Sequence, residues 1–543
     1  MKTRAETLAH LREQTFDLLV IGGVATGAGI ALDAATRGLR AALIEKEDFA
    51  FGTSSRSTKL IHGGLRYLKQ FEIGLVREVG LERAIVHRNA PHLVIPEKML
   101  LPLIRGGQYG KFMTAIGLTV YDLLARVAKP DRRRMLSKEK TLQKEPLLDA
   151  SRLKGGGHYA EYRTDDARLT VALIRTAIEA SACCANYVSA EGFEKAEGQV
   201  TGVLACDALT QETFPIQAKQ VVNATGPWVD ELREKDGSRS GKGLHLTKGV
   251  HLVVSHERLP VQQSIYFDVP DGRMIFAIPR GAITYIGTTD TTYEEDISHP
   301  KTSKADANYL LDAVNAFFPE VTLTLADVQS TWAGLRPLIH EDGKSPSELS
   351  RKDEIFESPD GLISIAGGKL TGYRKMAERV VDRVVKRLPN QDQDCSTATR
   401  VLASGPFKDS AEVDAYINTI QERFKGFGIN DATNLATTFV QRYGRDVDVI
   451  LGHAQEQQQQ ASESPETVLL RAEVWFTVTH EMVQRASDFC VRRSGRLYFA
   501  RPQLTEQLPI ILEALQKHLD WSDQRRSEEQ QAMEVWFDEV SIH

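Results

Sequence analysis

Apolar and polar positions near the start of the chain follow the order strand, helix, strand. Residues 16–21 (FDLLVI) form a short apolar run that ends in glycines, as buried parallel strands do. Residues 25–38 are rich in alanine and predict a helix, and residues 41–45 predict a second buried strand. Together these segments predict one βαβ unit.

Later segments divide between a return to this first sheet and two further regions. Residues 221–224 and 362–366 are apolar strands followed by Gly226-Pro227 and Gly367-Gly368, and they predict strands beside the first unit. Strand-like runs at 251–254, 274–278 and 284–286 predict a second, sheet-based domain within residues 76–150 and 246–340. After about residue 389 the periodicity becomes helical.

The turn after the first strand has the form of a dinucleotide-binding loop. Its residues are Gly22, Gly23, Val24, Ala25, Thr26 and Gly27, and Glu45 ends the next strand where an acid would bind ribose hydroxyls. Strand, glycines, helix, strand and acid occur in the expected order, which favours a nucleotide cofactor.

Val24 departs from this pattern, since glycine is expected at the second position of G-x-G-x-x-G. A β-branched side chain there occupies space that a pyrophosphate approaches, and it resists backbone angles that glycine allows. Either the loop shifts slightly and the cofactor still binds, or the affinity for the cofactor is weakened.

Composition narrows the class of protein. The chain has 543 residues, which predicts two or three domains, and a net charge of -6 gives no reason to expect a nucleic acid partner. Five scattered cysteines show neither CxxC nor metal-ligand spacing, so we expect a reducing compartment and no metal. Without an apolar signal segment or a 20-residue apolar span, we expect a cytoplasmic or peripheral protein.

Six motifs together resemble the FAD-dependent aerobic glycerol-3-phosphate dehydrogenases of bacteria. They are TSSRSTKLIHGGLRYL at 53–68, YRTDDARL at 162–169, VNATGPW at 222–228, IGTTD at 286–290, GLRPL at 334–338 and GGKLTGYR at 367–374. The similarity runs essentially from residue 15 to the end of the printed sequence. Within that family, glycine is expected at position 24.

The resemblance implies an α/β fold of the glutathione-reductase/D-amino-acid-oxidase type. A Rossmann-type FAD domain would comprise residues 1–75, 151–245 and 341–389. An antiparallel substrate cap would comprise residues 76–150 and 246–340, and a C-terminal helical domain residues 390–543. The implied reaction is oxidation of sn-glycerol 3-phosphate to dihydroxyacetone phosphate, with hydride transfer from C2 to flavin N5.

The reaction requires cations for the substrate phosphate, and arginine suits this role because its fork matches phosphate oxygens. By resemblance, Arg66, Tyr67, Arg351 and Lys369 form the phosphate side, and Arg336 lies nearest the reacting carbon. The alternative for each arginine is a solvated surface ion pair.

Candidates for the base that accepts the hydroxyl proton are His62 and His251, since histidine titrates near neutral pH. His62 precedes two glycines and is expected beside the flavin, whereas His251 alternates with apolar residues on a cap strand. A structural histidine is the alternative for each, and we favour His251 as the base. Further FAD contacts are expected from Thr53, Ser54, Ser55, Ser57, Gly226, Gly368, Lys369, Leu370 and Thr371.

Family resemblance implies a membrane quinone as electron acceptor and attachment to the inner face of the cell membrane. Within residues 111–134 an uncharged apolar run is followed by four cations, at 129–134. This suits an anionic lipid interface but also a core helix with a charged end. A glycerol-3-phosphate oxidase that uses O2 and a non-catalytic FAD-binding protein are the alternatives. The sequence leaves a homodimer open.

Overall fold

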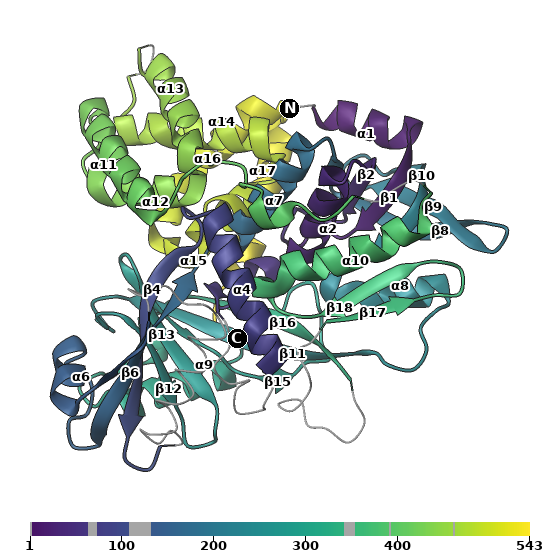
Figure 1. Cartoon of the computed structure of the whole chain (residues 1–543). Helices are drawn as coiled ribbons and strands as arrows, with labels where there is room; N and C mark the ends of the chain where they lie inside the picture. Colours follow the sequence, from purple (N-terminus) through teal and green to yellow (C-terminus); the bar gives the residue numbers. More distant parts are fainter. Residues whose placement is uncertain (1–2, 63–72, 108–131, 341–352, 390–392, 460–461) are drawn as a thin grey trace.

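The computed structural model describes residues 3–62, 73–107, 132–340, 353–389, 393–459 and 462–543. It contains two sheets and a bundle of helices, which form three regions in Figure 1. The α/β class and the C-terminal helical domain are those that the sequence predicts.

The first sheet is built round parallel strands. Its order is β17 (Asp353–Glu357), β18 (Ile363–Gly367), β10 (Glu212–Asn223), β1 (Thr15–Ile21), β2 (Ala41–Glu45) and β7 (Cys183–Asn186), with β8 (Val188–Ala196) and β9 (Gln199–Asp207) beside β10. Strands β18, β10, β1, β2 and β7 are parallel, and β17, β8 and β9 are antiparallel additions. The expected strands at 221–224 and 362–366 therefore lie in this sheet.

Both faces of the first sheet are covered because successive side chains of β1 point to opposite sides. Leu18 and Val20 face a core shared with α2 (Ala25–Thr36), α7 (Asp166–Glu179) and α10 (Tyr373–Arg387). Leu19 and Ile21 face a core shared with α1 (Arg4–Glu13), α8 (Val229–Asp236) and the β8–β9 hairpin. The buried pattern of β1 thus places its glycine-rich end between two helical layers, at the carboxyl edge where ligands bind.

The second sheet is mainly antiparallel. Its order is β15 (Thr291–Thr292), β11 (Leu244–Ser255), β14 (Ile283–Gly287), β13 (Met274–Arg280), β12 (Ser264–Asp268), β4 (Ile95–Ile104), β6 (Leu153–Arg163) and β3 (Leu60–Ile61), with β16 (Val328–Ile339) beside β11 and β5 (Arg134–Leu136) beside β6. Helix α9 (Lys304–Phe317) packs on one face, and α6 (Lys138–Lys144) contacts β6.

The structure puts two elements on the other side of an expected domain boundary. β6 lies in the second sheet rather than with residues 151–245 of the FAD domain, because it pairs with β4 along almost its whole length. Most of helix α4 (Ile73–Asn89) lies in the first part expected for the cap, residues 76–150, yet Val86 packs into the core of the first sheet. Both placements depend on contacts between distant segments.

The C-terminal helices pack on one another and on the second sheet (Figure 1). They are α11 (Ser410–Phe427), α12 (Ala432–Tyr443), α13 (Val447–Gln458), α14 (Pro465–Glu481), α15 (Arg496–Phe499), α16 (Arg501–Leu519) and α17 (Asp523–Glu539). A turn of π-helix, η8 (Asp488–Arg493), connects this domain to the FAD domain through buried ion pairs.

His92 is buried where the C-terminal domain meets the first core, and its ring lies 5.4 Å from that of Phe407. Within the described part of the chain neither ring nitrogen has a hydrogen-bond partner. Burial, reinforced by the charges of Arg168 and Arg175, lowers the pKa of His92 to about 3.

We expect the neutral state of His92 to make the fold sensitive to acid. Because its pKa is lower in the folded than in the unfolded chain, the unfolded chain takes up the proton first as the pH falls below about 6.5, and stability is lost in that direction. At about pH 5 this group alone should cost about 2 kcal/mol. Thermal unfolding from neutral to acid pH should therefore show a smaller decline for His92→Leu than for the wild type. Equal slopes for the wild type and His92→Leu would refute the assignment.

Candidate active site

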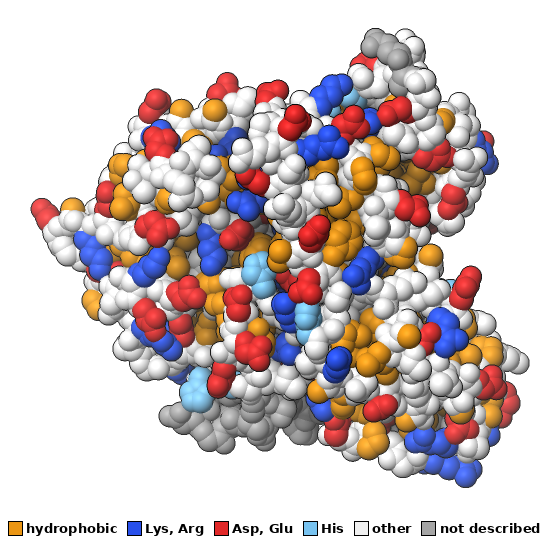
Figure 2. Space-filling view, turned by 180° about the vertical axis from the view of Figure 1, so that it is seen from behind, with side chains coloured by type: hydrophobic (Ala, Val, Ile, Leu, Met, Phe, Trp, Pro, Cys, Tyr) orange, Lys and Arg blue, Asp and Glu red, His pale blue; other side chains and the backbone are white. Residues whose placement is uncertain are grey.

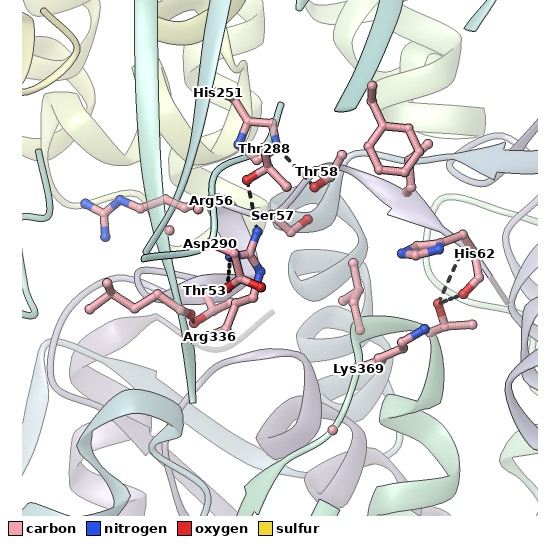
Figure 3. Close-up of a pocket in the computed structure, with 18 of the residues that line it drawn as sticks. Thr53, Arg56, Ser57, Thr58, His62, His251, Thr288, Asp290, Arg336 and Lys369 are labelled. Carbon is pink, nitrogen blue, oxygen red and sulfur yellow. Dashed lines mark hydrogen bonds and ion pairs between the residues drawn. The ribbon is translucent and has the colours of Figure 1, made fainter. Parts of the chain in front are cut away.

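One cavity of about 770 Å³ lies between the carboxyl edge of the first sheet and the second sheet (Figure 3). It is lined by fourteen of the site residues expected from the sequence: Val24, Ala25, Thr26, Thr53, Ser54, Ser57, His62, Gly226, His251, Arg336, Gly368, Lys369, Leu370 and Thr371. These residues come from segments more than three hundred positions apart, so the fold brings the predicted cofactor and substrate groups to one place.

The glycine loop lies behind this lining. Gly22 has φ +114°, and a Cβ on Gly27 would lie 1.9 Å from the carbonyl oxygen of Gly22. Glycine at these two positions lets β1 turn directly into α2. The N-terminus of α2 thereby reaches the cavity wall formed by Val24, Ala25 and Thr26, where a helix N-terminus attracts a pyrophosphate.

The side chain of Glu45 hydrogen-bonds the backbone of the glycine loop. Its two carboxylate oxygens accept the backbone N–H groups of Gly23, at 2.6 Å, and Glu47, at 3.0 Å. Burial raises the pKa of Glu45 despite these bonds. Contact with a ribose remains a prediction, but the structure adds a second task for this acid, which the sequence pattern did not indicate.

Val24 occupies the N-cap position of α2 with φ -89° and ψ 175°. This is extended backbone that valine adopts without strain, so the expected conflict with the backbone angles does not occur. The steric question remains, because the side chain lines the cavity where the pyrophosphate is expected.

We therefore expect Val24→Gly to raise FAD affinity because it removes a side chain from the cavity, and not because it relieves strain in the backbone. If the isopropyl group displaces the pyrophosphate enough to lose one charge-assisted hydrogen bond, the cost is about 1.5–3 kcal/mol, roughly ten- to a hundredfold in affinity. Titration of apoprotein with FAD gives the two dissociation constants, and Tm should rise with occupancy. Val449→Gly is the control for the effect of a valine-to-glycine change as such, because Val449 is exposed on α13. Val20→Gly on β1 cannot serve, because Val20 is buried and its loss would open a core. Equal dissociation constants for the wild type and Val24→Gly would show that the loop has absorbed the valine.

Residues 53–58, the flavin loop, run past the N-terminus of α2. Ser54 Oγ accepts the N–H of Ala25 at 3.1 Å and so caps α2 in place of Val24, which makes no side-chain cap. Thr53 and Ser57 line the cavity. Ser55 is buried outside the lining, and its hydroxyl lies 3.4 Å from the carbonyl oxygens of both Phe51 and Gly52. Ser55 is thus placed to shape the loop, and its FAD contact remains a prediction.

Arg336 lies on β16, with its guanidinium fixed in one orientation. Nη2 donates to Thr288 Oγ1 at 2.9 Å, and Nη1 donates to the carbonyl oxygen of Thr289 at 3.2 Å and to Asp290 Oδ1 at 3.3 Å (Figure 3). Gly249 on the neighbouring strand makes room for it, since a Cβ there would lie 2.2 Å from Nη2. The fork is therefore held in the cavity wall by the turn after β14.

His251 lies on β11 close to this arginine. Its ring stacks on Trp332 at 4.7 Å, and its Nε2 is 3.0 Å from Thr58 Oγ1. Burial, with the charges of Arg336 and Lys59, lowers the pKa of His251 well below its ordinary value. The imidazole is neutral at physiological pH and so retains a lone pair for a proton.

His62 and Lys369 lie on the opposite side of the cavity from His251 in Figure 3. The backbone N–H of His62 donates to Thr371 Oγ1 at 3.2 Å, which joins the strand after the flavin loop to the turn after β18. The two candidate bases thus belong to different walls: His251 is near Arg336, and His62 is near Lys369.

Several expected residues cannot be placed. Arg66, Tyr67 and Arg351 lie outside the described residues, as does most of the segment 111–134. Over the described part of the chain no helix is long and apolar enough to cross a membrane. In the same part no cluster of three His, Cys, Asp or Glu side chains is arranged to hold a metal ion.

Some cavity residues were not expected from the sequence. Thr58 lines the cavity and contacts His251, and Arg273, on the β12–β13 hairpin, also lines it. Trp332 lies outside the lining and stacks on His251. Thr58 belongs to the motif at 53–68, so the sequence could have indicated it. No sequence pattern indicated Trp332 or Arg273, because their positions depend on which strands pair.

A Rossmann-type sheet with a glycine loop, joined to an antiparallel sheet over one large cavity, defines the class of flavoprotein oxidoreductases. Residues 17–373 match the model of the FAD dependent oxidoreductase family, and residues 395–526 match the C-terminal domain of alpha-glycerophosphate oxidase. The chain belongs to this FAD-dependent oxidoreductase family, and within it groups with the aerobic glycerol-3-phosphate dehydrogenases. FAD is its cofactor.

Two relatives are similar over nearly the whole of both chains. The aerobic glycerol-3-phosphate dehydrogenase of Bacillus subtilis (strain 168) is 48% identical over 96% of this chain and 95% of its own. That of Staphylococcus aureus (strain USA300) is 50% identical over 94% of this chain and 92% of its own.

Two solved structures show how far the fold likeness extends. The glycerol-3-phosphate dehydrogenase from Bacillus halodurans complexed with FAD has a TM-score of 0.84 at 43% identity, covering 99% of this chain and 97% of that one. The L-alpha-glycerophosphate oxidase from Mycoplasma pneumoniae shares the fold alone, with a TM-score of 0.55 at 18% identity over 70% of this chain and 98% of that one.

Proposed function

We propose that this chain oxidises sn-glycerol 3-phosphate to dihydroxyacetone phosphate and passes the electrons to a membrane quinone. The observation that supports it most is the anchored guanidinium of Arg336 beside the neutral imidazole of His251, in the wall of the FAD cavity. Lys369, in the same cavity, would supply a cation for the substrate phosphate, and a secondary alcohol needs a proton acceptor. The relatives named above are called aerobic glycerol-3-phosphate dehydrogenases, which supports the substrate and the oxidation.

FAD supplies the two-electron acceptor when it is bound. The chain's own residues bind and orient the alcohol: Lys369, with Arg66, Tyr67 and Arg351, would hold the phosphate, and Arg336 would direct the carbon end. His251 would take the hydroxyl proton on a ring nitrogen, with Trp332 and Thr58 fixing the plane of the ring. His62 would contact the flavin. Gly22, Gly23, Val24, Ala25, Thr26 and Gly27 would hold the pyrophosphate.

Attachment to the inner membrane face, through residues that include the segment 111–134, belongs to the same proposal, because a quinone is reached at the lipid surface. Acidic, basic and apolar side chains are interspersed over the face shown in Figure 2. The proposed cell compartment is the cytoplasm, and a homodimer is compatible with the proposal.

Turnover with two acceptors tests the proposal. Purified FAD-loaded protein with sn-glycerol 3-phosphate should reduce a short-chain quinone and form dihydroxyacetone phosphate in equal amount. Glycerol, which lacks the phosphate, is the matched control substrate. Peroxide formed at the same rate from O2 alone would assign the chain to the oxidases, and no turnover with either acceptor would leave an FAD-binding protein without this activity.

A further inference from the structure

The flavin loop lies directly on β16, the strand that bears Arg336. Thr53 Oγ1 donates to the carbonyl oxygen of Leu335 at 2.7 Å. Trp332 Nε1 donates to the carbonyl oxygen of Ser57 at 3.0 Å. Between them Gly334 allows close approach, since a Cβ there would lie 2.2 Å from the carbonyl oxygen of Arg56. A displacement of this loop therefore changes the FAD contacts and the position of β16 together.

Arg56 connects this loop to a distant part of the chain. In Figure 3 its side chain points away from Arg336 and His251. Arg56 as a whole is only 4% exposed. Its guanidinium donates to Glu539 Oε1 at 2.8 Å and to the carbonyl oxygen of Phe51 at 3.1 Å. The guanidinium also lies 5.7 Å from the ring centre of Trp536 on α17.

Glu539 is the last residue of α17, in the C-terminal helical domain, and it has two partners. Oε1 accepts from Arg56, and Oε2 lies 2.7 Å from His299 Nδ1. Burial works to raise the pKa of Glu539, but Arg56 and His299 outweigh it and the pKa is lowered, so the group is an anion. The next residue continues the contact, because the carbonyl oxygen of Val540 accepts the N–H of Thr331 on β16 at 2.8 Å.

We propose that Glu539 is a positioning residue for the FAD site: by holding Arg56, it fixes the flavin loop against β16 and thereby the guanidinium of Arg336. The C-terminal helical domain then has a part in the reaction although Glu539 does not line the cavity. The alternative is a buried ion pair that only stabilises the contact between domains.

The two interpretations differ in what they predict for the folded, FAD-loaded protein. A pair that only stabilises lowers Tm and leaves each folded molecule with normal FAD affinity and turnover. A pair that positions the loop changes the FAD dissociation constant, and it changes kcat more than KM, because a shifted Arg336 loses contacts that matter most in the transition state.

Glu539→Gln removes the charge and keeps the shape. FAD titration of the apoprotein should show a dissociation constant about tenfold higher, and kcat per bound FAD should fall by about tenfold, with KM changing less than about threefold. Both are measured well below Tm. If Glu539→Gln does not fold, Glu539→Asp keeps the charge at a shorter reach and should show the same pattern more weakly.

Glu473→Gln is the matched control. Glu473 is a fully buried carboxylate of the same domain, on α14, and it pairs with Arg442 and Arg496 away from the flavin loop. Glu473→Gln should lower Tm and leave the FAD dissociation constant and kcat per FAD unchanged.

The proposal is overturned if Glu539→Gln lowers only Tm, or if both variants change FAD binding alike. The kcat comparison rests on the proposed function, whereas the FAD titration does not depend on the substrate. If the wild type does not oxidise sn-glycerol 3-phosphate, the proposed function fails, and the FAD dissociation constants still test the positioning role of Glu539.

Discussion

Arg336→Lys should lower kcat by about ten- to a hundredfold while KM changes by less than about threefold. The guanidinium uses both Nη1 and Nη2 to bond the turn at Thr288–Asp290, and these bonds fix the plane of its fork. Lysine has one nitrogen, so it cannot keep these anchors and also present a donor to the substrate in a fixed direction. The loss falls on the transition state, where charge shifts at the reacting carbon.

Steady-state kinetics at saturating FAD and acceptor measure both constants. Arg258→Lys is the matched control, because this exposed arginine pairs with Asp327 far from the cavity and should leave kcat and KM unchanged. An increase confined to KM would show that Arg336 is only an anchor for the phosphate, and the role given to it near the reacting carbon would be wrong.

Asp48→Asn should be the most destabilising single change considered for this chain, at about 3–5 kcal/mol. Asp48 follows β2 and is fully buried; its oxygens accept from Arg492 at 2.6 Å and from Arg493 at 2.7 and 2.8 Å. Burial alone would raise the pKa of Asp48, but the two arginines lower it. Asparagine would remove the shared carboxylate between two buried guanidinium groups at this contact between the FAD domain and η8. Arg492 would keep Asp488, at 2.7 Å, and Arg493 would keep only the more distant Glu481, at 3.6 Å.

Thermal unfolding of both proteins at one FAD concentration measures this loss. The FAD dissociation constant of each protein is measured beside it, because bound FAD stabilises a protein according to that constant. Asp382→Asn is the control: Asp382 pairs with Arg37, but its side chain is 48% exposed, so its loss should cost no more than about 1 kcal/mol. A Tm for Asp48→Asn within the range of the control would mean that the network at η8 does not hold the two domains together.

The sequence predicted local elements well where periodicity and glycines act over a few residues. The strand expected at 41–45 is β2 itself, and the helix expected at 25–38 is α2, Ala25–Thr36. The sequence predicted that a second, sheet-based domain exists, but it did not predict the order of the strands in that sheet. β3 consists of Leu60 and Ile61 alone, and it exists because these residues pair with Arg163 and Tyr162, about a hundred positions away.

The candidate site shows the same limit. Motifs placed His62 and Arg336 among the functional residues, and an alternating apolar pattern on an expected cap strand added His251. The cavity brings the three together. No local pattern indicated that Thr288 and Asp290 fix Arg336, or that Glu45 bonds the glycine loop, because these contacts form only when strands and turns from separate segments meet. Arg56 and Glu539 are 483 positions apart, and only the packing of α17 joins them.

Anaerobic addition of sn-glycerol 3-phosphate to the purified, FAD-loaded protein tests the central claim most directly. The visible absorbance of oxidised flavin should bleach in a single turnover, with one dihydroxyacetone phosphate formed for each FAD reduced. Glycerol and the mirror-image sn-glycerol 1-phosphate should leave the absorbance unchanged. The account would be contradicted if dithionite bleached the flavin while sn-glycerol 3-phosphate did not, because the cavity would then hold a competent FAD without acting on this substrate.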